Sequence, residues 1–399
     1  MHDHGLVDTE ADLRVLLDAI AGSPWVAVDT EFMREKTYFP QLCLIQLATP
    51  DHIACIDPLA FSDLGPLKAL LHDPEVLKVF HAASQDIEVL YLVTGKVPGP
   101  IFDTQVAASL LGHGEQVGYA NLVQAVLQHE LDKTQSRTDW SQRPLKSEQL
   151  SYARDDVRYL VQLFLSLQRE LDALGRLNWL QPEMEALGRP ELYQADLEGA
   201  WRRVSGHKRL KPRELAVLRE LASWRENQAR DLDRPRRWII SDDALLLIAR
   251  TRPTDVQALR ELRGLPKGIG ETQARQILQA VHKGSEAPRE TWPVLSKRRP
   301  LAEAEEVIVD VGMALLRDLA RRQQISPEAV ASRKDVVALM RGEEDAALAR
   351  GWRQQVAGAE LRRWLLGDCA VRCDGPRIGM VELSEATDDS GTSPRDQAL

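Results

Sequence analysis

The chain has 399 residues, of which 44% are apolar and 28% charged, as is typical of a soluble globular protein with two or three domains. No apolar run reaches the roughly 18 residues that a membrane span needs, and no signal-peptide pattern opens the sequence. The net charge of −9 is unevenly spread: residues 1–200 hold 15 basic and 30 acidic side chains, whereas residues 201–375 hold 34 and 25. The acidic front half argues against a general anion-binding surface there, and the basic back half is compatible with a polyanionic partner.

The four cysteines do not form a metal-binding pattern. Cys43 and Cys55 lie in apolar runs and are expected in the core, while Cys369 and Cys373 have no second Cys or His pair nearby. A zinc site is therefore not expected. This sparse usage fits a reducing compartment, and we expect a cytoplasmic protein.

The first 200 residues alternate strand and helix signals. Thr9 and Asp12 resemble a capping box, so a helix is expected to begin near residue 10. The other expected elements are a strand at 25–32, a hairpin formed by 42–48 and 53–56, a strand at 76–81, a helix from residue 84, and helices between about 105 and 175. This succession predicts a mixed sheet with helices on its faces.

Two carboxylates stand out on the expected strand at 25–32. Asp29 and Glu31 are two residues apart, so their side chains project from the same face. Like charges this close repel one another, and burial raises the cost. A divalent cation such as Mg²⁺ is the usual compensation; the alternative is a solvent-facing pair on an edge strand.

Further acidic residues belong with this pair. Asp86 lies at a strand-to-helix junction, and Asp103 follows an apolar pair as either a supporting acid or a helix cap. Tyr152 and Asp156 are four residues apart on an expected helix and so share one face. Asp155 points about 100° away and is expected to face solvent.

Hydrolysis of phosphodiesters by two metal ions uses such a set of carboxylates. Several carboxylates hold two Mg²⁺ or Mn²⁺ ions about 3.5–4 Å apart, which activate a water and stabilise the leaving oxygen. A phenol beside the water can orient it. The carboxylates and the tyrosine of this chain are the residue types that such a reaction needs.

The same residues match three exonuclease motifs. The pattern Asp29-x-Glu31, Asp86 and Tyr152-x-x-x-Asp156 resembles the tyrosine subtype of the DEDD superfamily of 3′→5′ exonucleases. Phe-His-Ala-Ala-Ser-Gln-Asp and Phe-Asp-Thr-Gln, at 80–86 and 102–105, resemble the bacterial ribonuclease D family. The match runs through residues 1 to about 200 and implies a ribonuclease H-like exonuclease domain.

The resemblance also implies roles for these residues. Asp29 would bridge both metal ions, Glu31 and Asp156 would complete one site, and Asp86 would serve the other. Tyr152 would position the attacking water. Asp86 as a helix N-terminal acid and Tyr152 as a core aromatic are the alternatives.

Other residues are candidates for contact with the substrate. Phe32 can stack on the terminal nucleotide and Gln85 can hydrogen-bond to it, although both also suit purely structural roles. His81 is a further candidate, but a packed histidine is the more common interpretation. A basic and aromatic loop suits single-stranded RNA, with an ordinary surface loop as the alternative; its members are Lys133, Arg137 and Trp140.

The back half is helical. Amphipathic patterns predominate from about 211 to 366, with a faint internal repeat, and the segment from Leu215 to Val281 resembles the HRDC domain, a small helical bundle. The resemblance implies nucleic-acid binding and a second, more diverged copy. The densest basic cluster of the back half consists of Arg230, Arg234, Arg236 and Arg237. Phosphate contact would explain this cluster, and a solvated helix end is the alternative.

We therefore expect four segments. They are a DEDD exonuclease domain at 1–200, a first HRDC domain at 208–288, a diverged HRDC-like domain at 296–375, and a polar, disordered tail at 376–399.

The resulting hypothesis is a 3′→5′ exoribonuclease that trims tRNA precursors and other RNAs. It would use two Mg²⁺ or Mn²⁺ ions and release nucleoside 5′-monophosphates. Its expected partner is RNA with a single-stranded 3′ end, with neither a membrane nor an obligate protein partner. A 3′→5′ exonuclease for single-stranded DNA and a non-catalytic RNA-binding adaptor are the alternatives.

Overall fold

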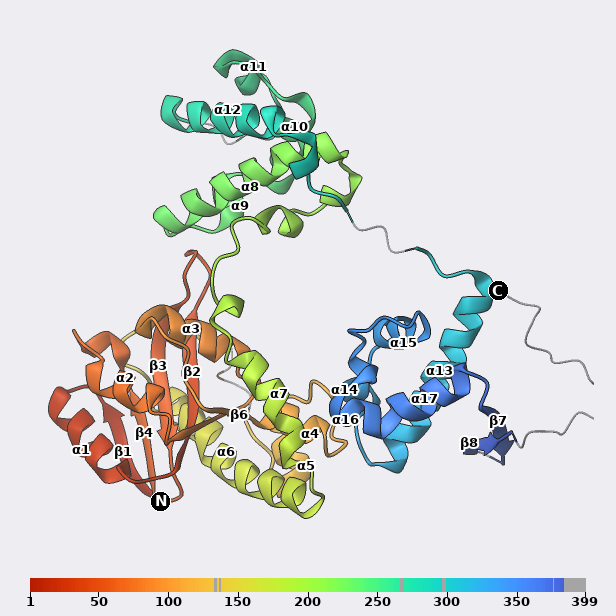
Figure 1. Ribbon diagram of the computed structural model, residues 1–399. Helices are drawn as coiled ribbons and strands as arrows, with labels where there is room; N and C mark the ends of the chain where they lie inside the picture. The colour runs from red at the N-terminus through yellow and green to blue at the C-terminus, as the bar shows by residue number, and fades with distance from the viewer. Residues whose placement is uncertain (133–134, 136–137, 266–268, 296–298, 376, 384–399) are drawn as a thin grey trace, which may run out of the picture.

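The computed structural model describes residues 1–132, 135, 138–265, 269–295, 299–375 and 377–383. Figure 1 shows an α/β unit formed by the front half and helical units formed by the back half, which confirms the expected fold class. The elements of the front half are β1 (His2–Val7), α1 (Glu10–Ile20), β2 (Trp25–Met33), β3 (Gln41–Ala48), β4 (His52–Ile56), α2 (Gly65–His72), β5 (Leu77–Phe80), α3 (Ser84–Thr94), β6 (Ile101–Asp103), α4 (Thr104–Ser109), α5 (Tyr119–Leu127), α6 (Ser147–Ala173) and α7 (Leu177–Leu187).

The six front strands form one mixed sheet in the order β1-β4-β3-β2-β5-β6. Strands β2, β5 and β6 are parallel, β3 is antiparallel to both β2 and β4, and β1 is parallel to β4. The expected hairpin and the strands at 25–32 and 76–81 are confirmed. The edge strand β1 was not predicted, because its polar sequence His-Asp-His-Gly lacks an apolar alternation.

Helices cover both faces of this sheet. The long helix α6 packs on β2, β3 and β4. Its Phe164 is only 1% exposed, and burial of such a side chain stabilises the fold by about 1.5–3 kcal/mol. On the opposite face, side chains of α1, α2 and α3 join those of the strands in a second apolar cluster. The helix expected near residue 10 begins at Glu10, where Thr9 accepts the backbone N–H of Asp12. These two layers hold β2 rigidly between α3 and α6.

The back half is mostly helical, and its elements repeat. Two 20-residue helices, α8 (Pro212–Asp231) and α13 (Glu303–Arg322), are each followed by a four-residue helix and then another helix. The remaining elements are α9 (Arg236–Ile239), α10 (Asp242–Thr251), α11 (Val256–Arg260), α12 (Glu271–Glu286), α14 (Pro327–Val330), α15 (Arg333–Met340), α16 (Gly351–Arg353), a π-helical turn (Gln354–Gly358), α17 (Ala359–Leu365), β7 (Cys369–Asp374) and β8 (Arg377–Glu382). Among the helices of the described residues, none has the length and apolar character to cross a bilayer.

One prediction about the end of the chain was wrong. Residues 376–399 were expected to be a disordered tail, yet β8 (Arg377–Glu382) pairs with β7 in an antiparallel hairpin. Ile378 and Met380 lie two residues apart on β8, and both pack against the apolar cluster of the last helical unit. Residues 384–399 lie outside the described part of the chain.

Both helical units contact the α/β unit. The apolar core of the α/β unit continues into the last helical unit. Trp352 stacks on Trp179 of α7 with ring centroids 5.2 Å apart, and Arg353 pairs with Glu183 at 2.6 Å. The first unit touches the loop between β2 and β3, where Asp233 accepts the backbone N–H groups of Tyr38 and Phe39. The helical units are therefore attached at two different places.

Candidate metal centre and active site

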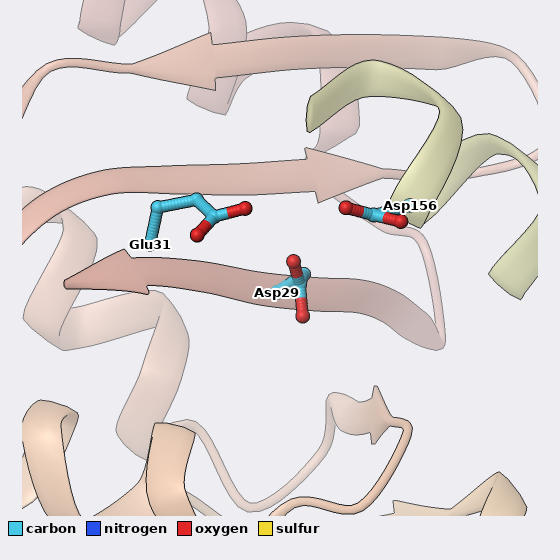
Figure 2. A group of neighbouring side chains, drawn as sticks. All are labelled: Asp29, Glu31 and Asp156. Atoms are coloured by element: carbon cyan, nitrogen blue, oxygen red, sulfur yellow. The ribbon is translucent and has the colours of Figure 1, made fainter. Parts of the chain in front are cut away.

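Three carboxylates come together beside β2. Asp29 and Glu31 project from one face of this strand, and Asp156 approaches them from α6. One oxygen of each lies within 4.8 Å of the others, and Figure 2 shows the three side chains directed toward one another. The two spacings predicted which side chains share a face of the strand and of the helix, and the structure brings the three acids to one point.

Asp86 faces the group from the other side of the strand. It lies in the first turn of α3, is 8% exposed, and accepts a hydrogen bond from the Thr30 hydroxyl at 2.5 Å. On β2, the Thr30 side chain points to the face opposite Asp29 and Glu31. The strand therefore presents these two carboxylates on one face and binds Asp86 through Thr30 on the other. The two sets of carboxylates therefore have a fixed relation to one another.

Asp103 positions the turn that leads to Asp86. Its carboxylate accepts the backbone N–H groups of Ala82 at 3.0 Å, Ala83 at 2.9 Å and Gln105 at 2.8 Å. Ala82 has a φ of 56°, a left-handed conformation that an alanine adopts only at a cost. Asp103 is thus a helix cap and also stabilises the strained turn before α3.

Tyr152 lies beside the three carboxylates. Burial first, and then the charges of Asp156, Glu31 and Asp29, raise the pKa of its hydroxyl. The phenol therefore stays protonated through the physiological range and can act only as a neutral hydrogen-bonding group there.

Without a bound cation, the ionised form of these carboxylates is strongly disfavoured. Burial is the main cause, followed by mutual repulsion: the pKa of Glu31 rises to about 10 and that of Asp156 to about 8, and the pKa values of Asp29 and Asp86 are also well above normal. Oxygen ligands in this number and at this spacing suit a hard divalent cation. The donor set thus fits such an ion, whose charge would remove the repulsion.

Gln46 gives a second sign of a missing polar partner. It is fully buried on β3 directly opposite Asp29, so both side chains face α6. Within the described part of the chain, neither its amide nitrogen nor its amide oxygen has a hydrogen-bond partner. Buried amides are normally satisfied, and a hydrated ion at Asp29 would bring polar groups to this position.

A cavity of about 520 Å³ contains most of the predicted site. The predicted residues that line it are Asp29, Glu31, Phe32, His81, Gln85, Asp86, Tyr152 and Asp156. Within this set, His81 is already engaged, because its ring nitrogens lie 3.0 Å from the Thr104 hydroxyl and 3.1 Å from the Val117 carbonyl. Burial lowers the pKa of His81, so it is neutral and packed.

One predicted substrate contact is wrong. Trp140 is 2% exposed and packs in the core 6.2 Å from the Tyr152 ring, so it supports that tyrosine rather than facing RNA. Its basic surroundings in the sequence gave no sign that the indole turns inward. Lys133 and Arg137 lie outside the described residues.

Sequence reasoning missed three residues of the site. Tyr119 lines the cavity and donates to the Asp155 carbonyl at 3.1 Å, which ties α5 to the helix that carries Asp156. Thr30 and Gln46 are the others. The polar side chain of Gln46 inside an apolar strand was the only available signal.

The four arginines of the predicted basic cluster differ in their contacts. Arg236 is committed to Glu226, with hydrogen bonds of 2.6 and 2.7 Å, whereas Arg237 lies 3.7 Å from Asp242 and is exposed. Arg234 is exposed, and Arg230 lines a second cavity. Phosphate contact by these four side chains remains a prediction.

The raised pKa values predict how stability depends on pH. In a chelator, the folded protein retains protons that the unfolded chain loses near pH 4, so the free energy of unfolding should fall as pH rises toward about 10. Mg²⁺ binds the ionised carboxylates and should therefore raise the melting temperature more at about pH 9 than at about pH 6. Thermal unfolding with EDTA and with millimolar Mg²⁺ measures this; an equal metal-induced shift at both pH values would contradict the assignment.

Comparison with known families matches both parts of the chain. A family model described as a 3′–5′ exonuclease matches residues 5–172, and an HRDC domain model matches residues 214–281. The first match covers all five residues of the acidic and tyrosine set. The second spans α9, α10 and α11 and most of α8 and α12.

Whole-length relatives are also found. The chain is 39% identical to ribonuclease D of Bartonella henselae over 382 residues, 95% of this chain and 94% of that relative. It is 40% identical to ribonuclease D of Sphingobium indicum over 386 residues, 96% and 99% of the two chains. The crystal structure of Escherichia coli RNase D, an exoribonuclease involved in structured RNA processing, has a TM-score of 0.76 at 32% identity and covers 91% of this chain and 98% of that chain.

Proposed function

The chain belongs to the ribonuclease D family of 3′→5′ exoribonucleases, and we propose that it trims the 3′ ends of tRNA precursors and other RNAs with two Mg²⁺ or Mn²⁺ ions. The products are nucleoside 5′-monophosphates, released one at a time. The cytoplasm is the proposed compartment, in keeping with four free cysteines. The observation that carries the proposal is the convergence of Asp29, Glu31 and Asp156 in one cavity with Asp86 and Tyr152.

Each residue of this set has a defined task. The charge of Asp29 raises the pKa of Glu31 and of Asp86, and its own pKa is raised by Asp156. Asp29 would therefore be a ligand common to both ions. Glu31 and Asp156 would complete one ion site, and Asp86, held by Thr30, would serve the other. Bound divalent ions supply activation of the attacking water and neutralisation of the leaving 3′ oxygen.

The remaining side chains orient the reactants. The neutral Tyr152 hydroxyl hydrogen-bonds to the water and fixes its line of attack on the phosphorus. Phe32 and Gln85, which line the same cavity, would stack on the terminal base and hydrogen-bond to the terminal nucleotide. Positioning of this kind accounts for much of the rate enhancement in such reactions.

The substrate class is tested by direct competition between nucleic acids. We expect the purified protein with Mg²⁺ to degrade a single-stranded RNA faster than the DNA of matched sequence and length. Faster loss of the DNA would support the deoxyribonuclease alternative, and loss of neither, with RNA still bound, would support the adaptor. Both oligonucleotides carry a 5′ label, so that the shortened products are resolved by size.

A further inference from the structure

A second cavity lies where the α/β unit meets the first helical unit. It measures about 340 Å³ and has walls from α3, the loop between β2 and β3, the segment after α7, and helices α8 and α9. Four arginines and four aromatic residues line it; those used below are Arg34, Tyr91, Tyr193, Arg203, Arg230 and Arg236. This volume lies in the lower part of the range for ligand pockets, about 300–1,000 Å³, and suits a segment the size of a nucleotide.

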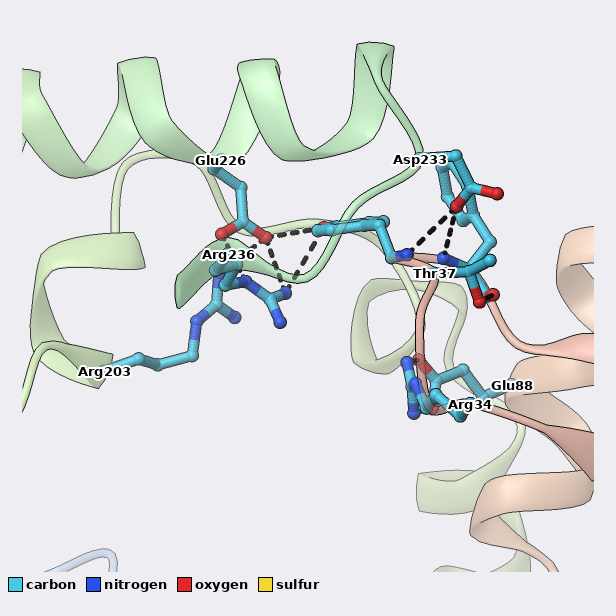
Figure 3. A network of polar contacts seen from close by, with 9 residues as sticks. Arg34, Thr37, Glu88, Arg203, Glu226, Asp233 and Arg236 are labelled. Carbon is cyan, nitrogen blue, oxygen red and sulfur yellow. Dashed lines mark hydrogen bonds and ion pairs between the residues drawn. The ribbon is translucent and has the colours of Figure 1, made fainter. Parts of the chain in front are cut away.

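The walls of this cavity are held in place by a polar network (Figure 3). Glu226, which is 1% exposed, accepts hydrogen bonds from the Tyr38 hydroxyl at 2.5 Å and from Arg236. The Arg236 guanidinium also lies 4.7 Å from the centre of the Tyr38 ring. Asp233 fixes the backbone of the same loop. These contacts join the two units around the cavity.

The positive charge of the cavity is only partly neutralised. Arg34 makes a bidentate pair with Glu88, and Arg236 does so with Glu226. Arg203 is 47% exposed, but it pairs with Glu226 at 3.3 Å and donates to the Asp196 carbonyl at 3.2 Å. Within the described ranges, the exposed Arg230 side chain has no hydrogen bond or ion pair. The Arg230 guanidinium is therefore available to an anion, and that of Arg203 is partly engaged.

Aromatic surface lies beside these free charges. The rings of Tyr91 and Tyr193 are 6.2 Å apart and inclined at 39°, and Tyr193 is fixed by a hydrogen bond of its hydroxyl to the Leu187 carbonyl. Tyr91 is half-buried on α3 and presents its ring to the cavity. Arginines with aromatic rings form the combination that binds single-stranded nucleic acid, by phosphate pairing and base stacking.

We propose that this cavity is an RNA subsite, in which Arg230 and Arg203 bind a phosphate and Tyr91 stacks on a base upstream of the 3′-terminal nucleotide. The proposal rests on the proposed function, since it assigns an upstream part of the same RNA. The arginines and aromatic rings of the cavity favour an RNA chain as the occupant. The cavity also shares two segments with the metal centre, because Arg34 follows Glu31 by three residues and Tyr91 lies on α3, the helix that carries Asp86.

The test measures RNA binding without cleavage. Single-stranded RNA of about 4 to 16 nucleotides is titrated into the protein in EDTA, and the dissociation constant is read by fluorescence anisotropy. Arg230→Ala should raise the dissociation constant of the longest RNA about tenfold, as expected for one charged hydrogen-bonding contact. The dependence of log K on log salt should become shallower by about 0.7, the value for one phosphate. Tyr91→Leu should also weaken binding, with folding checked by thermal unfolding.

A matched control is available on the same helix. Arg213 is exposed at the opposite end of α8 and does not line the cavity, so Arg213→Ala should bind as the parent does. If Arg230→Ala and Arg213→Ala behave alike, the subsite is refuted. An equal effect of Arg230→Ala on adenosine 5′-monophosphate and on the longest RNA would identify a free-nucleotide site instead. Binding by the parent without cleavage in Mg²⁺ would contradict only the proposed function.

Discussion

Replacing Asp29 with asparagine should abolish nuclease activity while leaving the protein folded and able to bind RNA. Asp29 is one of the three clustered carboxylates, and its charge also raises the pKa of Glu31 and Asp86, so without it divalent ions would not be held correctly. Loss of several kcal/mol of charge stabilisation corresponds to a rate at least about 10³-fold lower. Single-turnover degradation of a labelled RNA measures the rate, and anisotropy measures binding.

Stability and a neighbouring acid supply the controls for Asp29→Asn. The uncharged amide relieves repulsion, so the melting temperature in EDTA should not fall. Asp155 lies next to Asp156 but pairs with Arg158 at 3.1 Å, away from the three-carboxylate group. Asp155→Asn should therefore retain activity within a few-fold of the parent. Degradation by Asp29→Asn at the parent rate would show that the metal assignment is wrong.

Tyr152→Phe should lower the rate of hydrolysis about 10²-fold, the effect of removing one oriented hydrogen-bonding group from a reaction centre. The phenol has a strongly raised pKa and stays neutral, so the pH–rate profile should keep its shape after the substitution. Rates at saturating RNA and Mg²⁺, measured from about pH 6 to about pH 9, test both statements.

The comparison variant for Tyr152 is on the same helix. Tyr159 stacks on His129 with ring centroids 4.4 Å apart, outside the catalytic cavity. Tyr159→Phe should keep the parent rate. If Tyr152→Phe also keeps it, the hydroxyl does not orient the water; if it instead weakens Mg²⁺ binding, Tyr152 acts by holding Asp156.

Four residues of the site were predictable because local periodicity fixes which of them share a face. The alternation of a strand brings Asp29 and Glu31 to one face, and one helical turn aligns Tyr152 with Asp156. What the sequence could not show is the side-chain partner across the fold. Gln46 opposes Asp29 only through the register of β2 and β3, and Tyr119 reaches α6 only through tertiary packing.

The same limit explains the errors. Trp140 has a polar, basic neighbourhood in the sequence, but its indole packs beneath Tyr152. The partner of Arg236 was likewise not visible in the sequence: its guanidinium pairs with Glu226, ten residues earlier on α8, and phosphate contact by this residue stays a prediction. In the fold, the edge strand β1 and the hairpin of β7 and β8 were missed, because each is stabilised by its partner strand more than by its own pattern.

The central claim is that this chain removes nucleotides one at a time from RNA 3′ ends by means of divalent ions at Asp29, Glu31, Asp86 and Asp156. A time course on a 5′-labelled tRNA precursor, with Mg²⁺ and with EDTA, tests it most directly. The account predicts a ladder that shortens by single nucleotides in Mg²⁺ and is absent in EDTA. Internal fragments, shortening from the 5′ end, or an unchanged ladder in EDTA would contradict it.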